Sequence, residues 1–256
     1  MSVIKSFFIA FSLYSKIPVP QFEWKKEDMK YTLIFFPFVG AVIGGLIWLW
    51  WWIAGMCDME KITYVLIGTV IPLIITGGFH VDGYMDTMDA LNSYKPREEK
   101  LRILKDSHIG AFSVIMLLVL YLQYIAMFAS IKDEKSIIVF VMGFFLSRVL
   151  SAIGVVTIPS ARNDGLLFTF ASAAHRKIVK SILYIMLVTC VAIMLAVSLK
   201  AGIGAVLMAV IIFWYYKKKM MKEFGGITDY YCIRIFFYYF FHFIHRIFPI
   251  KKHFSD

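Results

Sequence analysis

Long apolar runs constrain this chain more than any other feature. A crossing of the bilayer needs about 20 predominantly apolar residues. Five runs lack any charged side chain: 33–54, 62–79, 109–131, 181–199 and the shorter 201–216. A sixth run, 136–159, holds a single charge, Arg148. The sequence therefore predicts an all-α fold, a polytopic transmembrane helical bundle with six spans.

Apolar segments also lie near both termini. The stretch FFIAFSLY near the start predicts an N-terminal helix at the membrane interface. Near the other end, residues 233–248 carry Arg234 and Arg246, so a seventh span and an interfacial helix both remain open. Because no repeat or linker divides the chain, we expect a single integral membrane domain over residues 1–256.

The net charge of +10 is distributed unevenly along the chain. Eighteen basic residues precede the first span or lie in the segments 80–108, 160–180 and 217–232, against four in the opposite connections. This is the positive-inside pattern, which predicts that the N-terminus and these three segments are cytoplasmic. The expected location is the cell membrane, with lipid as a partner. Nucleic acid is not needed to explain the charge, and a homo-oligomer is compatible with the sequence.

An acidic cluster follows the second apolar run, in GGFHVDGYMDTMDAL. Asp82, Asp86 and Asp89 recur at i, i+4 and i+7, which places three carboxylates on one face of a helix. No Lys or Arg lies between positions 79 and 94 to neutralise them. Carboxylate oxygens favour Mg²⁺, which commonly joins them to substrate phosphates. The alternative interpretation is a solvated acidic face.

Basic residues follow the acidic cluster and indicate an anionic substrate. The segment 97–105 is rich in Lys and Arg and leads to Asp106, Ser107 and His108. Arg148 is expected to face the bundle interior, where it meets a carboxylate or a substrate phosphate. The predicted substrate contacts are His80, Arg102, Lys105, Ser107, Arg148, Arg162, Asp164 and Thr228.

The sequence resembles the cobalamin synthases, also called adenosylcobinamide-GDP ribazoletransferases, over nearly its whole length. FSLYSKIPVP is similar to the opening segment of that family. GGFHVDGYMDTMDAL resembles its aspartate signature, and KDSHIGAF its second motif. SRVL followed by ARNDGL resembles its third motif.

The resemblance implies a phosphoryl-group transfer that completes cobalamin. The substrates would be adenosylcobinamide-GDP and α-ribazole or its 5′-phosphate, and GMP would leave. On this reading the catalytic residues are Asp82, Asp86, Asp89 and Asp106. The first three would hold one or two Mg²⁺ ions, and one of the four would accept the hydroxyl proton.

One motif departs from the family pattern. The family usually has Gly-Gly-x-Thr-Gly-Asp before its last apolar stretch, whereas this chain has FGGITDYYC. Asp229 occupies the second glycine position unless one residue is deleted, in which case it is the equivalent carboxylate. Both alignments remain open.

Two other functions compete with this reading. A CDP-alcohol phosphotransferase also uses aspartates at a membrane boundary, but its Ala-Arg after Asp-Gly is absent here. A corrinoid or cation transporter commonly shows paired repeats, and none is visible.

Overall fold

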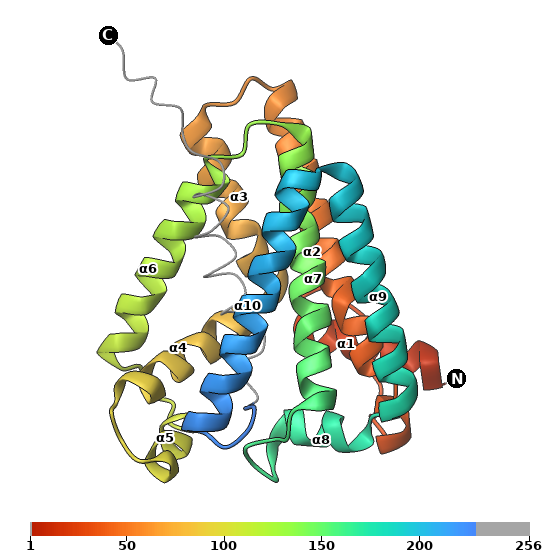
Figure 1. Cartoon of the computed structure of the whole chain (residues 1–256), viewed down its shortest axis with the longest axis vertical. Coiled ribbons are helices and arrows are strands. Elements are labelled where there is room, and N and C mark those ends of the chain that lie inside the picture. Colours follow the sequence, from red (N-terminus) through yellow and green to blue (C-terminus); the bar gives the residue numbers. More distant parts are fainter. Residues whose placement is uncertain (1, 229–256) are drawn as a thin grey trace.

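The computed structural model describes residues 2–228, and these residues are mostly helical (Figure 1). Within them the only β pairing is one isolated bridge between Ser160 and Ile227. Among residues 2–228, five helices are each long and apolar enough to cross a membrane. They are α2 (Thr32–Met56), α6 (Ala111–Phe128), α7 (Glu134–Thr157), α9 (Arg176–Val197) and α10 (Leu199–Glu223). The predicted all-α membrane bundle is confirmed.

The remaining predicted span is broken by a sharp corner. α3 (Lys61–Thr76) and α4 (Phe79–Asn92) are long and apolar enough to cross a membrane only when taken together, and they are bent by 92°. Gly77 and Gly78 form the corner with φ values of 61° and 77°. Glycine adopts this left-handed conformation without a steric cost. α3 therefore runs along the bundle, whereas α4 runs nearly perpendicular to α3.

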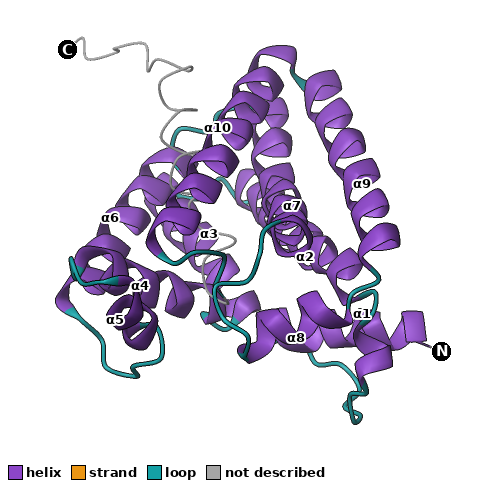
Figure 2. Cartoon of the chain, turned by 60° about the horizontal axis from the view of Figure 1, so that its bottom comes forward, coloured by secondary structure: helices purple, strands orange, loops and turns teal. Residues whose placement is uncertain are grey.

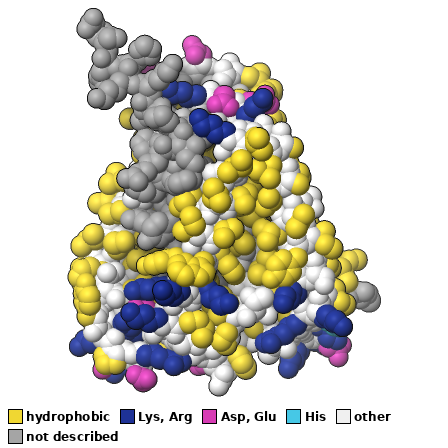
Figure 3. Space-filling model, in the orientation of Figure 1, with side chains coloured by type: hydrophobic (Ala, Val, Ile, Leu, Met, Phe, Trp, Pro, Cys, Tyr) yellow, Lys and Arg dark blue, Asp and Glu magenta, His cyan; other side chains and the backbone are white. Residues whose placement is uncertain are grey.

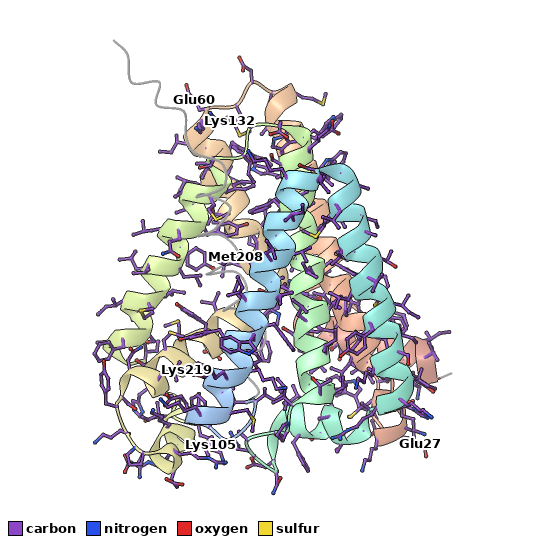
Figure 4. All side chains as sticks on the ribbon, in the orientation of Figure 1. Glu27, Glu60, Lys105, Lys132, Met208 and Lys219 are labelled. Atoms are coloured by element: carbon purple, nitrogen blue, oxygen red, sulfur yellow. The ribbon has the colours of Figure 1, made fainter. Side chains whose placement is uncertain are left out.

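Successive spans alternate in direction. Glu60 and Lys132 lie at one end of the bundle, and Lys105 and Lys219 lie at the other (Figure 4). The second end also carries α4, α5 (Arg97–Ile103) and α8 (Gly165–Ala173). We call it the basic end, because Lys and Arg side chains form a band there (Figure 3). The segments predicted to share one side of the membrane do lie at one end.

α2 and α7 form the central helix pair, and small residues bring their backbones close together. A Cβ added to Gly40 would meet the carbonyl oxygen of Phe144, and one added to Gly44 would meet that of Val141. Glycines four residues apart commonly permit such close packing in membranes. α9 and α10 then pack on α7, and α6 packs on α3 and α4.

The N-terminal segment supports the corner between α3 and α4. α1 (Ser2–Tyr14) is too short to cross a bilayer and packs on α2 and on η1 (Lys26–Met29). It matches the predicted N-terminal helix. Beyond it, the backbone N–H of Lys16 donates to the carbonyl of Ile75 at 2.7 Å. The candidate seventh span, 233–248, lies outside the described residues.

Figure 2 shows the basic end turned forward. α4 and α5 lie on one side of it, and α8 and α1 lie on the other. Segments far apart in the sequence therefore meet at this end, and most of the predicted site residues are on them.

Candidate active site

α4 carries the acidic cluster, so the predicted helix is confirmed there. Asp82 is exposed, and Asp86 and Asp89 are half-buried. Burial, followed by the neighbouring charges of Asp82 and Asp89, raises the pKa of Asp86 to about 6. On α4 the i, i+4 and i+7 spacing places the three carboxylates on one face, near one another. Their repulsion is the kind of strain that a bound cation relieves.

The opposite face of α4 is apolar and anchors the helix. Tyr84 and Met88 are buried, with exposed fractions of 3% and 8%. The hydroxyl of Tyr84 donates to the carbonyl of Met116 on α6 at 3.2 Å. Because one face is fixed by packing, the acidic face is held in a defined direction.

Asp89 has a second role that its spacing does not reveal. Its two carboxylate oxygens accept the backbone N–H groups of Gly110, at 2.7 Å, and of Ser113, at 2.9 Å. These are among the N–H groups at the start of α6 that lack a partner within the helix. A Cβ on Gly110 would collide with the carboxylate. Asp89 therefore caps α6 and joins the first motif to KDSHIGAF.

The carboxylates of α4 are of the type that binds a divalent cation, but only two of the three are available to bind one. Among residues 2–228, no group of three or more His, Cys, Asp or Glu side chains is arranged to hold a metal ion. Asp82 and Asp86 are spaced one helical turn apart and supply the hard oxygen atoms that Mg²⁺ prefers. Both oxygens of Asp89 are engaged by backbone N–H groups. The pair Asp82 and Asp86 is thus the part of the cluster that fits Mg²⁺.

Asp106 is held by a residue of its own motif. One of its oxygens, Oδ1, accepts the backbone N–H of His108 at 3.0 Å and lies 2.6 Å from His108 Nδ1. The side-chain hydrogen bond and then the backbone hydrogen bond from His108 lower the pKa of Asp106. Asp106 and Ser107 are both exposed, and so is Arg102 on α5.

Three predicted substrate contacts form one charged bridge. Asp164 accepts Lys105 Nζ at 3.1 Å and Arg162 Nε at 2.7 Å (Figure 4 labels Lys105 at the basic end). The hydrogen bonds from Arg162 and then Lys105 lower the pKa of Asp164 to about 2. The bridge connects the loop after α5 with the loop before α8. Both cations are therefore within reach of one anionic group.

Arg148 and His80 lie deeper than these surface residues. Arg148 is 2% exposed on α7, and its Nη1 donates to the carbonyl of Phe144 at 2.9 Å. Within residues 2–228 no carboxylate pairs with it, so the expected interior position is observed without an acidic partner. The ring of His80 stacks against that of Tyr14, with centroids 6.1 Å apart.

Thr228 ends the described residues and is 4% exposed. The neighbouring Ile227 accepts the N–H of Ala161 at 2.7 Å and donates to the carbonyl of Pro159 at 2.9 Å. A Cβ on Gly226 would collide with this backbone pairing. The Gly-Gly motif is therefore held by backbone hydrogen bonds and close packing against the segment that leads to Arg162; we call this pairing the Gly-Gly clamp. Asp229 lies outside the described residues.

Two contacts at the basic end join residues that are distant in the sequence. Lys100 on α5, 8% exposed, forms an ion pair with Glu223 at the end of α10. The guanidinium of Arg97 lies beside Gly225, whose φ is 73°. These partners are more than a hundred residues apart in the chain, so no local pattern could reveal the pairing.

Known proteins resemble this chain over most of its length. A family model described as cobalamin-5-phosphate synthase matches residues 6–230. An adenosylcobinamide-GDP ribazoletransferase of Lachnoclostridium phytofermentans is 42% identical over 89% of this chain and 87% of its own length. One of Desulfitobacterium hafniense is 34% identical over 64% of this chain and 66% of its own. One of Clostridium perfringens is 33% identical over 60% and 61%.

No solved structure matches the chain. The family match covers most of the sequence and includes the corner, the acidic helix, the charged bridge and the Gly-Gly clamp. The chain therefore belongs to the cobalamin-5-phosphate synthase family.

Proposed function

We propose that this protein is an adenosylcobinamide-GDP ribazoletransferase, which joins the two halves of cobalamin at the basic end of the bundle. The observation that carries the proposal is the acidic helix α4, turned by 92° out of the span and fixed by its apolar face. Family membership and the relatives' activity supply the substrates, and the cations of the charged bridge suit their phosphate groups.

The proposed reaction transfers a phosphoryl group from the GMP portion of the donor to the ribose hydroxyl of the acceptor. The ribose 3′-hydroxyl oxygen of α-ribazole, or of its 5′-phosphate, attacks the phosphorus on the cobinamide side of the diphosphate. A new P–O bond forms, the P–O bond to the GMP portion breaks, and GMP leaves. The hydroxyl proton passes to a carboxylate, for which Asp82, Asp86, Asp89 and Asp106 are the candidates. The product is adenosylcobalamin or its 5′-phosphate.

Mg²⁺ is the cofactor that we propose for this site. Asp82 and Asp86 would hold it, and Asp89 would contribute mainly by fixing α6 against α4. A bound Mg²⁺ supplies positive charge to the phosphoryl oxygens of the diphosphate. The role of the protein is to keep the two carboxylates aligned on one rigid helix.

Three cations of the basic end, exposed Arg102 and Lys105 and half-buried Arg162, are proposed to bind the diphosphate. Lys105 and Arg162 are already gathered by Asp164, and Arg102 lies on the adjacent α5. A phosphate oxygen would replace the carboxylate of Asp164 as the partner of one cation. Ser107 adds an exposed hydroxyl in the same loop.

We also propose that the basic end faces the cytoplasm. The argument is the positive-inside distribution, since the four basic residues of the opposite connections contrast with eighteen at this end. Cysteine replacement at exposed positions, followed by labelling with an impermeant maleimide in intact cells, tests this. Labelling of Ser107→Cys from outside would overturn it.

Turnover by the purified protein tests the activity. It is incubated with adenosylcobinamide-GDP, α-ribazole or its 5′-phosphate, and Mg²⁺, and GMP and the cobamide are quantified. We expect equal amounts of the two products. Release of CMP from a CDP-alcohol would identify a CDP-alcohol phosphotransferase instead. Flux of a corrinoid across proteoliposomes without GMP would identify a transporter.

A further inference from the structure

Three segments at the basic end form a closed ring of contacts. They are residues 97–105, which hold α5 and the start of the loop after it, residues 159–164 before α8, and residues 223–227 at the end of α10. The charged bridge joins the first segment to the second, and the Gly-Gly clamp joins the second to the third. The ion pair between Lys100 and Glu223 joins the third segment back to the first. Each segment is therefore held at two points.

The links of this ring differ in their exposure to water. Asp164, at the centre of the charged bridge, has a side chain that is 60% exposed. Lys100 is 8% exposed, and Ile227 in the Gly-Gly clamp is fully buried. Exposed ion pairs are weak, whereas removal of one partner from a buried pair leaves an uncompensated charge. The bridge is thus the link that an incoming anion can open, and the other two links are the lasting ones.

The ion pair attaches α5 to the end of a spanning helix. α5 has seven residues and packs mainly on α4. The side of α5 that faces α10 carries Lys100 and, one turn earlier, Arg97, whose guanidinium lies against Gly225. Glu223 also accepts Lys219 Nζ at 3.0 Å, from one turn before it on α10. The carboxylate of Glu223 is therefore held in place on α10, and Lys100 binds α5 to it (Figure 4 labels Lys219).

We infer that the ion pair between Lys100 and Glu223 positions the cations that bind the donor. It holds α5 and the loop after it beside Arg162 while the diphosphate is bound. The inference rests on the proposed function, which assigns these cations to the diphosphate of adenosylcobinamide-GDP. A phosphate that takes the place of the Asp164 carboxylate opens the charged bridge. The ion pair and the Gly-Gly clamp then keep the two loops together without touching the substrate, so Lys100 and Glu223 are positioning residues.

The test separates donor binding from the chemical step. Lys100→Met removes the charge and keeps an unbranched side chain in the buried position. It should raise the KM of adenosylcobinamide-GDP about tenfold, because a charged hydrogen bond that prealigns the binding cations is lost. The dissociation constant of the donor, measured by calorimetry without acceptor, should rise equally. The values of kcat and of the acceptor KM should stay within about twofold of wild type. Lys100→Arg, which keeps the charge, should restore part of the donor affinity.

A double-mutant cycle tests whether the two side chains act as one unit. Glu223→Gln should raise the donor KM as Lys100→Met does, and the double variant should show no further rise. Lys219→Met is the matched control, because it removes the other cation that contacts Glu223 and leaves α5 untouched. Its donor KM should stay within about twofold of wild type, as expected for a pair on one helix surface.

A distance measurement gives a readout that needs no substrate. Glu99 on α5 and Lys222 on α10 are both exposed, so each can be replaced by cysteine and spin-labelled in a variant without native cysteines. The distance between the two labels should be narrowly distributed with Lys100 and Glu223 intact. The distribution should broaden in Lys100→Met and stay narrow in Lys219→Met.

Several outcomes would overturn the inference. A donor KM within about twofold of wild type in both Lys100→Met and Glu223→Gln would show that the ion pair does not position the cations. Multiplied losses in the double variant would show that the two residues act separately. Equal losses in donor and acceptor affinity would show a general structural role. If Lys100→Met does not fold, Glu223→Gln and Lys100→Arg decide the same point. A wild type that makes no GMP would refute the proposed function, while the label distances still report whether the ion pair holds α5.

Discussion

The carboxylate of Asp89 accepts the backbone N–H of Gly110 at 2.7 Å, across the loop that separates α4 from α6. This contact joins two motifs that sequence alone presents as separate. It fixes the start of α6 relative to the acidic face of α4, and it explains why a glycine follows His108 and Ile109. Within the acidic cluster, Asp89 therefore anchors α6, whereas the proposed chemistry depends on Asp82 and Asp86.

Replacing Asp89 should affect stability first. Asp89→Ala removes both acceptors from the start of α6 and should cost about 1 kcal/mol, as other N-terminal caps do. Asp89→Asn keeps one carbonyl acceptor and should lose less. The thermal midpoint in detergent measures both. An unchanged midpoint for Asp89→Ala, with turnover abolished, would instead make Asp89 a metal ligand.

Replacing Asp82 or Asp86 should reduce turnover and leave stability intact. Asp82→Asn and Asp86→Asn should each lower GMP release about hundredfold or more, because the charge that neutralises the cation at the diphosphate is lost. Their thermal midpoints should not fall, since each change relieves carboxylate repulsion on α4. Asp58→Asn, at the opposite end of the bundle, is the control and should retain full turnover. Near-wild-type turnover by both α4 variants at saturating Mg²⁺ would refute the assignment.

The corner between α3 and α4 should be sensitive to side chains in a graded way. Gly77→Ala and Gly78→Ala both force a side chain into the left-handed region, at about 1–2 kcal/mol each. A Cβ on Gly77 would also collide with the side chain of Lys16, whereas one on Gly78 meets nothing. Gly77→Ala should therefore destabilise more. Gly45→Ala, in open space on α2, should be neutral or slightly stabilising. Chemical denaturation in mixed micelles ranks the three.

Removal of divalent cations should stop turnover reversibly. EDTA should abolish GMP release, and Mg²⁺ or Mn²⁺ should restore it, because both accept hard oxygen ligands. Zn²⁺, which favours nitrogen and sulfur ligands, should restore little. Activity that persists after exhaustive chelation would exclude Mg²⁺ from the reaction. Circular dichroism in parallel shows that the helices stay intact.

Much of the fold followed from the sequence because apolar run length and loop charge are local properties. The helical spacing of Asp82, Asp86 and Asp89 was equally readable. The corner at Gly77 was only half visible, since two glycines indicate a break and not its angle. The capping role of Asp89 was hidden, because it depends on the position of Gly110 after the chain has turned back. The pairing of Lys100 with Glu223 likewise exists only through tertiary packing.

The partner of Arg148 could not be predicted from the sequence either. Its charge within an apolar run predicted an interior position, and the structure places it there. Whether it meets a carboxylate depends on which side chains face it from α3, α4 and α6, and spacing along α7 contains no information on that.

The 92° corner has a consequence for how the substrates meet. A straight continuation of α3 would stack its carboxylates at different depths, about 6 Å apart for residues four positions apart. Because α4 runs nearly perpendicular to α3 instead, Asp82, Asp86 and Asp89 lie at nearly the same depth at the basic end. A bulky, water-soluble corrinoid can then approach this row at the basic end without passing between the spanning helices.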